Sequence, residues 1–263
     1  MKLSVVIPSY RDPLLVKTIN SLLTSSELDS KLEIIGVLDG YWPEFPLVNN
    51  PKVRYVHLGA NRGMRGAINA GVQVARGEFI CRTDEHCLFS QGWDRIMTES
   101  CQPNWIMTSR RYFLDSKQWK VMDDPYIDYE KLVIQEGVKF SGQRWSSRDK
   151  QRKDIMVDET MAMQGSVWLM PRQWWKDVIG ELQTEGYGPH YQDSHEMIFR
   201  TWQAGGKMML NKNAWFAHRH RKFSRTHNDG TVENPANKEA GWQYSLDTWR
   251  EYYETTIRPE WQI

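Results

Sequence analysis

The sequence predicts an α/β protein with a mostly parallel central sheet and helices on both of its faces. Three observations indicate this fold class. Strand-like runs alternate with amphipathic helical patterns, the connections between them are short, and polar residues follow the strand-like runs at their carboxyl ends. At 263 residues the chain is long enough for one large domain of this kind.

The first third of the chain supplies four expected strands and two expected helices. A β-branched run, 3–7, is closed by Pro8, because proline cannot donate to a sheet ladder. Asp12 and Pro13 then resemble an N-cap and a first helical residue. Residues at helical spacing mark the two helices: Leu15, Ile19 and Leu22 in the first, and Met64, Ile68, Gly71 and Ala75 in the second. The other three strands are expected at 32–38, 53–57 and 78–82.

The remaining two thirds divide into a charged middle and a regular end. From about Asp115 to Asp158 apolar runs are short and charges are dense, which predicts an insertion or flexible lobe outside the core. Beyond it we expect a strand at 166–170, a helix at 193–204 and a strand at 207–210. We therefore expect a single domain, 1–263, with one half at 1–110, the charged insertion lobe at 111–158 and a second half with the C-terminal tail at 159–263.

Composition excludes several classes of protein. Lys and Arg total 34 against 33 for Asp and Glu, so any contact with nucleic acid requires a local basic patch. Three cysteines are too few for a disulfide framework. The first strand begins at Leu3, which leaves no room for a signal peptide, and no apolar run reaches the ~20 residues of a membrane span. We expect a cytoplasmic protein without a transmembrane segment.

The stretch CRTDEHCLF, 81–89, carries the most specific chemistry. It places Asp84, Glu85 and His86 at the end of a hydrophobic strand, where charged groups avoid burial unless they are paired or bound to metal. Two other strands end in Ser9-Tyr10-Arg11 and Asp39-Gly40, so one pocket at the carboxyl edge of the sheet is expected.

The spacing of these residues predicts a metal site. Asp84 and His86 lie two residues apart and project to the same side of an extended segment, with Glu85 pointing away as a hydrogen-bonded neighbour. Carboxylate with imidazole suits Mn²⁺ better than Ca²⁺ or Mg²⁺. A polar turn is the alternative, and zinc bound through Cys81, His86 and Cys87 is disfavoured by the spacing of the cysteines.

These motifs, in this order, resemble family 2 glycosyltransferases of the GT-A type, whose sheet is Rossmann-like. The matching stretches are VVIPSY, LDG and NRGMRGAINAGVQVARGEFICRTDEH. A finer resemblance is to the polypeptide N-acetylgalactosaminyltransferases, through DEHCLFSQGW, QGSVWLMPRQWW and DSHEMIFRTWQAGGKMML. Their last metal ligand falls on His218, with His220 as the alternative. The chain departs from their pattern at Ile68 and at 191–194.

The resemblance implies a metal-dependent glycosyltransferase that moves a sugar from a nucleoside-diphosphate sugar, expected to be a UDP-sugar, to a hydroxyl of a carbohydrate or protein. It also implies that 1–110 is the nucleotide-sugar-binding half and 159–263 the acceptor-binding half. The expected metal is Mn²⁺, with Mg²⁺ possible, held by Asp84, His86 and His218. The expected donor-binding residues are Pro8, Tyr10, Asp39, Asn61 and Arg65, together with Asp84. A plain Asp-Gly turn for Asp39 and an ordinary cap for Asn61 are the alternatives.

Asp193 is the expected catalytic base, because an inverting transferase needs a carboxylate that takes the proton of the acceptor hydroxyl. Glu196 is the second choice, and a helix cap is the alternative for Asp193. In a retaining enzyme no such base is required, and Asp193 would bind sugar hydroxyls instead. The sequence leaves the stereochemistry open.

Three other functions are weighed. Two basic clusters that contain Trp145 and Phe223 suit a hydroxylated base in DNA as acceptor: Arg144, Arg148, Lys150, Arg152 and Lys153; Arg219, Arg221, Lys222 and Arg225. A nucleotidyltransferase shares such a sheet, but it favours a glycine-rich phosphate loop after the first strand, and PSYRDPLL is not one. A non-catalytic module that binds sugar or nucleic acid is the third.

Overall fold

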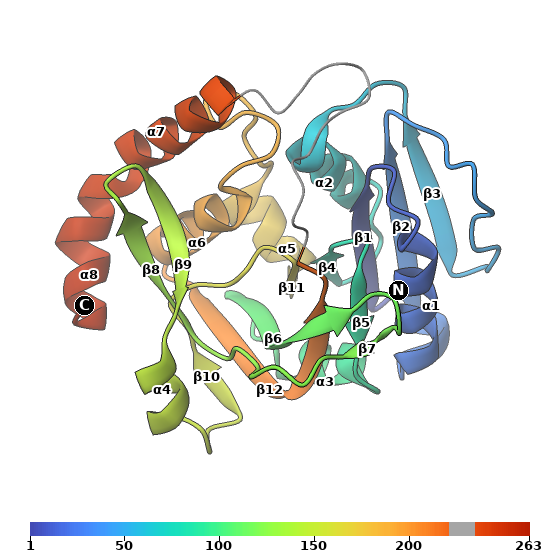
Figure 1. The fold of residues 1–263 in the computed structure, drawn as a ribbon, viewed down its shortest axis with the longest axis horizontal. Coiled ribbons are helices and arrows are strands. Elements are labelled where there is room, and N and C mark those ends of the chain that lie inside the picture. Colours follow the sequence, from blue (N-terminus) through green and yellow to red (C-terminus); the bar gives the residue numbers. More distant parts are fainter. Residues whose placement is uncertain (221–234) are drawn as a thin grey trace.

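In the computed structural model, residues 1–220 and 235–263 are described. They form a ten-stranded mixed sheet in the order β10-β12-β6-β11-β4-β1-β2-β3, with β5 paired to β12 and β7 paired to β6 (Figure 1). The expected parallel part is present, since β3, β2, β1 and β4 are all parallel neighbours and β12 runs parallel to β6. The strand bounds are β1 Leu3–Ser9, β2 Leu32–Asp39, β3 Val53–Leu58, β4 Phe79–Thr83, β5 Cys87–Phe89, β6 Trp105–Asp115, β7 Lys120–Val121, β10 Val157–Glu159, β11 Val167–Pro171 and β12 Lys207–His218.

Helices cover both faces of this sheet. Alternation along β1 sends Val6 to one face and Val5 and Ile7 to the other, and each set packs in a separate core. The first core lies under α2, α6 and α7, and the second lies under α1 and α3 (Figure 1). The helix bounds are α1 Leu15–Ser25, α2 Gly63–Gln73, α3 Trp93–Ser100, α4 Ser146–Gln151, α5 Arg172–Trp174, α6 Asp193–Gln203, α7 Pro235–Tyr252 and α8 Arg258–Trp261; short 3₁₀ and π turns lie at Asp29–Lys31, Trp175–Ile179 and Tyr253–Ile257.

The charged middle is ordered and belongs to the core, which corrects the expectation for this segment. Strands β8 Glu130–Gln135 and β9 Lys139–Arg144 form an antiparallel hairpin that lies against α7 (Figure 1). Leu132 and Phe140 of this hairpin are buried, and the Phe140 ring lies 4.8 Å from that of Phe199 in α6, centroid to centroid. Charged residues of the segment face outward or pair with one another, which is why the sequence concealed its apolar face.

Several strands differ from the sequence prediction, and β12 in particular continues to His218, well beyond its expected end at Leu210. β1 continues through Pro8 to Ser9, because β4 pairs only as far as Val6 and the missing N–H of Pro8 lies beyond that ladder. β6, a central strand between β12 and β11, was not predicted at all. The described residues contain no helix that is both long and apolar enough to cross a bilayer.

Candidate metal centre

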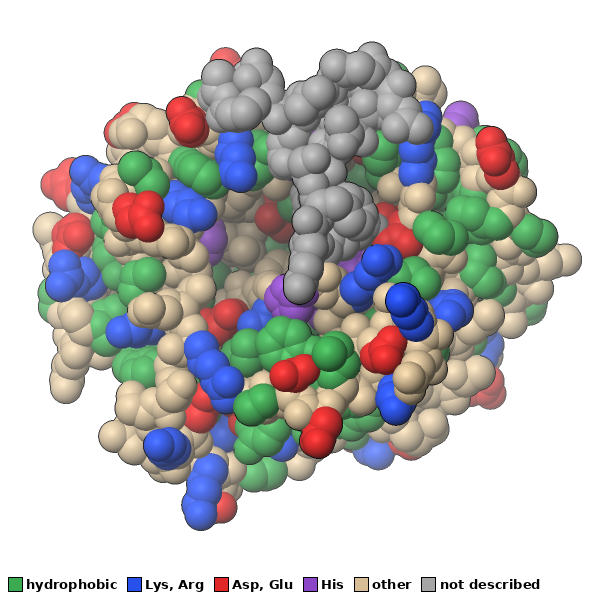
Figure 2. Space-filling model, viewed as in Figure 1, with side chains coloured by type: hydrophobic (Ala, Val, Ile, Leu, Met, Phe, Trp, Pro, Cys, Tyr) green, Lys and Arg blue, Asp and Glu red, His purple; other side chains and the backbone are tan. Residues whose placement is uncertain are grey.

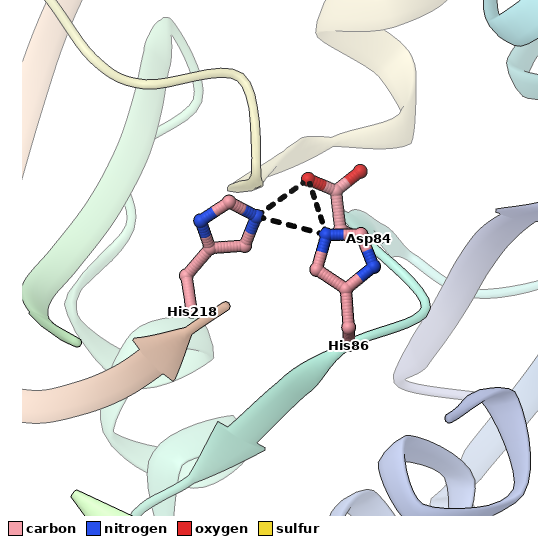
Figure 3. A group of neighbouring side chains, drawn as sticks. All are labelled: Asp84, His86 and His218. Atoms are coloured by element: carbon pink, nitrogen blue, oxygen red, sulfur yellow. Dashed lines mark hydrogen bonds and ion pairs between the residues drawn. The ribbon is translucent and has the colours of Figure 1, made fainter. Parts of the chain in front are cut away.

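Three predicted ligands meet at the carboxyl edge of the sheet. Asp84 and His86 lie in the turn between β4 and β5, and His218 is the last residue of β12. β12 pairs antiparallel with β5, with His218 opposite Cys87, so the pairing brings His218 beside His86. His218 Nε2 lies 3.0 Å from Asp84 Oδ2 and 3.1 Å from His86 Nε2, and His86 Nε2 lies 3.9 Å from Asp84 Oδ2 (Figure 3).

The surroundings of this cluster favour the protonation states of Asp84 and His218 that can bind a cation. Burial alone would raise the pKa of the Asp84 carboxyl, but the Arg82 guanidinium, 2.6 Å from Oδ1, and the hydrogen bond from His218 hold that pKa well below its ordinary value. Burial lowers the pKa of His218 to about 4, although the carboxylate of Asp84 opposes this shift. At neutral pH the site therefore presents one carboxylate and a neutral His218 imidazole, which are the forms that ligate metal.

Asp12 fixes the orientation of His86. Asp12 Oδ2 lies 3.1 Å from His86 Nδ1, and Asp12 Oδ1 accepts a hydrogen bond of 2.9 Å from the backbone N–H of Leu14 at the start of α1. A carboxylate can only accept, so the imidazole hydrogen is assigned to Nδ1 and the lone pair of Nε2 faces Asp84 and His218. Histidine ligands of metals commonly donate their other N–H to a carboxylate in this way.

The donor set fits a divalent transition metal. Ligand atoms at about 2.1 Å from one octahedral ion lie about 3 Å from one another, which is close to the two shorter separations measured around His218. One carboxylate with two imidazoles suits a transition metal such as Mn²⁺ better than Ca²⁺ or Mg²⁺, which prefer oxygen ligands throughout. Burial raises the pKa of the Cys81 and Cys87 thiols far above neutrality, and within the described part of the chain neither joins a cluster of possible ligands, so the structure does not support a zinc site built on these cysteines.

Glu85 does not join Asp84 and His218, but its carboxylate lies within 4.8 Å of possible ligand atoms of Asp12 and His86, so its expected direction away from the metal ligands stays a prediction. Its side chain is buried, and its carboxylate accepts the backbone N–H of Tyr10 at 3.1 Å. This bond joins the loop that follows β1 to the turn that carries Asp84 and His86. The Tyr10 ring lies edge-on to that of Tyr41, with centroids 5.7 Å apart, and the Tyr41 hydroxyl bonds Ser9 Oγ at 2.6 Å.

The predicted donor residues at the end of β2 form one turn with the start of α2. Asp39 Oδ1 accepts the backbone N–H of Arg62 at 2.6 Å, and Asn61 Oδ1 accepts that of Gly63 at 3.2 Å, so both side chains also serve as local caps. Gly40 has a φ of 73°, and a Cβ there would lie 2.2 Å from the Asn61 nitrogen, so this close approach requires glycine. Pro8 lies on neighbouring β1, which places all these residues at one edge of the sheet.

Arg65 and Glu196 occupy positions that speak against their predicted roles. Both side chains are fully buried and form an ion pair with each other. The Arg65 guanidinium also donates to the carbonyl oxygens of Tyr191 and Gln183. The Glu196 carboxylate forms a second ion pair, with Arg200, at 2.6 Å. The Arg65 guanidinium is completely buried and engaged on all three nitrogens, so it is not exposed to a diphosphate at the edge of the sheet. We correct both assignments: this pair anchors the segment before α6.

Asp193 is placed differently from an ordinary helix cap. It is the first residue of α6, yet no side-chain capping bond is made at this helix start. The Asp193 side chain is 7% exposed, and its Oδ2 has no hydrogen-bond partner among the described residues. It lies against Gly165, where a Cβ would approach Oδ2 to 3.3 Å. A buried carboxylate oxygen without a partner is costly and is typical of a functional site.

Two further sets of residues are placed by the structure. On the face seen in Figure 2, histidine and carboxylate side chains gather around a hollow between the two halves of the surface. The first basic cluster is partly neutralised, since Arg144 pairs with Asp149 and Arg152 pairs with Asp158 at 2.6 Å. Members of the second cluster lie outside the described residues: Arg221, Lys222, Phe223 and Arg225.

Sequence reasoning missed two residues of the metal centre. Asp12 was interpreted as a helix cap, and Arg82 as an ordinary strand residue. A signal for Asp12 was available, because it follows the first strand at the edge where the ligands gather. Arg82 lies only two residues before Asp84, but this spacing alone does not show that its guanidinium turns toward that carboxylate. The His220 ring lies 5.0 Å from the rings of Phe113 and His218, centroid to centroid, but His220 does not join the ligand cluster of the described residues.

Comparisons with known proteins agree with this geometry. A mouse (Mus musculus) protein, polypeptide N-acetylgalactosaminyltransferase 12, is 25% identical over 234 residues, which cover 79% of this chain and 38% of the mouse protein. A crystal structure of GalNAc-T7 with UDP, GalNAc and Mn²⁺ superimposes with a TM-score of 0.74 over 98% of this chain and 50% of that one, at 14% identity. A crystal structure of S. aureus TarS superimposes with a TM-score of 0.55 over 83% of this chain and 37% of that one, at 11% sequence identity. The chain thus spans half or less of the length of these relatives.

The two structural likenesses confirm the predicted GT-A type of α/β fold. The sequence model of glycosyl transferase family 2 matches residues 4–178, from the first strand to beyond β11. This match includes the turn that carries Asp84 and His86. Since it covers more than half of the 263 residues, the chain belongs to glycosyl transferase family 2.

Proposed function

We propose that the protein is a metal-dependent glycosyltransferase that moves a sugar from a nucleoside-diphosphate sugar to an acceptor hydroxyl. The observation that carries this proposal is the convergence of Asp84, His86 and His218, with Asp12 behind His86, at the carboxyl edge of the parallel strands. Ligands bind at this edge in open α/β sheets. The family match to residues 4–178 supports the same reaction class.

The metal would be held by Asp84, His86 and His218, with Mn²⁺ the first candidate and Mg²⁺ the second. A divalent ion there supplies Lewis-acid stabilisation for the negative charge that grows on the diphosphate leaving group. Asp12 keeps the His86 tautomer fixed, and Arg82 keeps one oxygen of Asp84 occupied, so neither ligand has to reorganise during the reaction.

UDP is the proposed nucleotide of the donor. GalNAc-T7, which shares the fold, was crystallised with UDP and Mn²⁺. In this chain the turn at Asp39 and Asn61 would receive the uridine, with Tyr10 as a wall of the nucleobase site. The Tyr10 backbone is tied to Glu85 beside the metal ligands, so the base-binding wall and the metal centre are mechanically joined.

Asp193 is proposed as the general base of an inverting reaction. Its buried Oδ2 has no partner in the described part of the chain and is therefore available to accept the proton of the acceptor hydroxyl. The anomeric configuration of the product tests this assignment, because a retaining product would make Asp193 a residue that binds sugar hydroxyls.

The acceptor is proposed to be a hydroxyl of a carbohydrate or protein, ahead of a hydroxylated base in DNA. Two of the arginines that suggested DNA, Arg144 and Arg152, are engaged with Asp149 and Asp158, so the described part of that patch is less available for phosphates than its sequence indicated. A titration against duplex DNA at several salt concentrations separates the two classes, because phosphate contacts make affinity fall steeply with salt.

The decisive experiment is a screen of nucleoside-diphosphate sugars for hydrolysis with and without Mn²⁺. We expect release of UDP from one UDP-sugar that depends on Mn²⁺ and is lost in Asp84→Ala and His86→Ala. His57→Ala, which removes an exposed histidine on β3, is the matched control and keeps the activity. Release of pyrophosphate from a nucleoside triphosphate would indicate a nucleotidyltransferase instead. Nucleotide-sugar binding without turnover would indicate a non-catalytic module.

A further inference from the structure

Arg82 is an arginine in the middle of the sheet. It lies on β4, paired with Val6 of β1 on one side and Trp168 of β11 on the other, and only 2% of it is exposed. Burying a guanidinium costs several kcal/mol unless it is fully engaged. A charge at such a position therefore calls for an explanation, and its contacts supply one.

The guanidinium joins two parts of the proposed catalytic site. Arg82 Nη2 donates to Asp84 Oδ1 at 2.6 Å, and Nη1 donates to the carbonyl oxygen of Gly165. Nη2 also contacts the sulfur of Met64 at 3.1 Å. With Oδ1 taken, the other carboxylate oxygen, Oδ2, faces His218. Gly165 in turn packs against the carboxylate of Asp193.

We propose that Arg82 is a positioning residue of the metal centre, which holds Asp84 as a one-oxygen ligand and ties it to the Gly165 turn beside Asp193. This inference rests on the proposed function, because it assigns a role to Arg82 within the same site. The planar fork of arginine suits the task, since its two nitrogens can engage two acceptors in fixed directions.

Two physical effects of Arg82 on a bound metal have opposite signs. A cation beside a metal ligand repels a divalent ion, so an effect through charge alone predicts tighter metal binding when the guanidinium is removed. Orientation of the ligand predicts the reverse, because a released Asp84 carboxylate can rotate away. Loss of such an outer hydrogen bond typically weakens metal affinity about 10- to 100-fold. The sign of the change therefore decides the question.

The test measures Mn²⁺ affinity by calorimetry, with and without UDP, in the wild type, Arg82→Gln, Arg82→Lys and Arg110→Gln. Arg110 is the matched control: it lies on β6 and makes two hydrogen bonds to the buried carboxylate of Asp128, but it touches no proposed ligand. Visible absorption of bound Co²⁺ reports the ligand geometry, which a loss of stability alone would not alter.

We expect Mn²⁺ binding about 10- to 100-fold weaker in Arg82→Gln with an altered Co²⁺ spectrum, a smaller loss in Arg82→Lys, and affinity within about twofold of wild type in Arg110→Gln. Unchanged or tighter binding in Arg82→Gln would overturn the inference, as would an equal loss in Arg110→Gln. If Arg82→Gln does not fold, Arg82→Lys decides: wild-type affinity and an unaltered spectrum would overturn the inference. Equal Mn²⁺ affinity of wild type and Asp84→Ala would instead overturn the proposed function itself.

Discussion

Asp12→Asn is expected to weaken metal binding through the tautomer of His86. In the wild type, Asp12 Oδ1 accepts the N–H of Leu14 at 2.9 Å and Oδ2 accepts from His86 Nδ1 at 3.1 Å. Asparagine keeps the first bond with its own oxygen, so its amide NH₂ must face His86. An NH₂ group only donates, which makes Nδ1 the acceptor and moves the imidazole hydrogen to Nε2, the atom assigned to the metal.

The magnitude follows from this geometry and from a comparison with Asp12→Ala. Losing the carboxylate behind a histidine ligand costs about 10- to 100-fold in metal affinity, or about 1.4–2.7 kcal/mol. Both variants remove the same charge, but alanine leaves His86 able to keep its hydrogen on Nδ1, with water as the acceptor. Mn²⁺ affinity should therefore fall in the order wild type, Asp12→Ala, Asp12→Asn. Stability should follow a different order, because only alanine loses the bond to Leu14, which is worth about 1 kcal/mol.

Calorimetric titration with Mn²⁺ and urea unfolding of the three proteins test this account. We expect the alanine variant to be the less stable of the two and the asparagine variant to be the poorer metal binder. The tautomer argument would be refuted if Asp12→Asn bound Mn²⁺ as tightly as the wild type, or more tightly than Asp12→Ala.

The remaining predictions concern the segment around α6. Asp193→Asn should leave UDP affinity unchanged but lower turnover by about 10²–10⁴, measured by UDP release; near-normal turnover would rule out the base. Glu196→Gln should lower the free energy of unfolding in urea by about 3–5 kcal/mol, because Arg65 would keep a buried, unpaired charge; a change under about 1 kcal/mol would contradict this. Burial and the nearby charges of Arg65 and Lys139 lower the pKa of His195 to about 4. Between pH 6.5 and 4 only the unfolded chain therefore binds this proton, and the free energy of unfolding should fall as pH falls. His195→Gln should flatten that fall in urea midpoints between pH 7 and pH 5, and an unchanged slope would contradict the assignment.

The parallel part of the fold could be predicted because its strands are short, mostly apolar runs between turn residues. All eight residues of β2 are buried, for example, and Asp39 and Gly40 follow directly. β6 escaped prediction because Arg110 and Arg111 interrupt its apolar pattern. Their charges are matched by Asp128 and Glu130, which lie nearby in space but 18 and 19 residues away in the chain. Such long-range pairing leaves no periodic signal.

The metal ligands could be predicted for a different reason from the residues that position them. The spacing of Asp84 and His86 is local, and His218 followed from an ordered series of motifs. The contact of Asp12 with His86 spans 74 residues, that of Arg82 with Gly165 spans 83 residues, and that of Arg65 with Glu196 spans 131 residues. Sequence reasoning placed Arg65 at the ligand because it opens the second helix, whose N-terminus favours anions. Its complete burial against Tyr187 and Glu196 reverses that interpretation.

The most direct test of the central claim is anomalous diffraction at the manganese edge from crystals grown with Mn²⁺ and UDP. The account predicts one strong peak within bonding distance of Asp84 Oδ2, His86 Nε2 and His218 Nε2, with the UDP diphosphate completing the coordination. A peak bound by other residues, or UDP bound at full occupancy with no peak at this position, would contradict it.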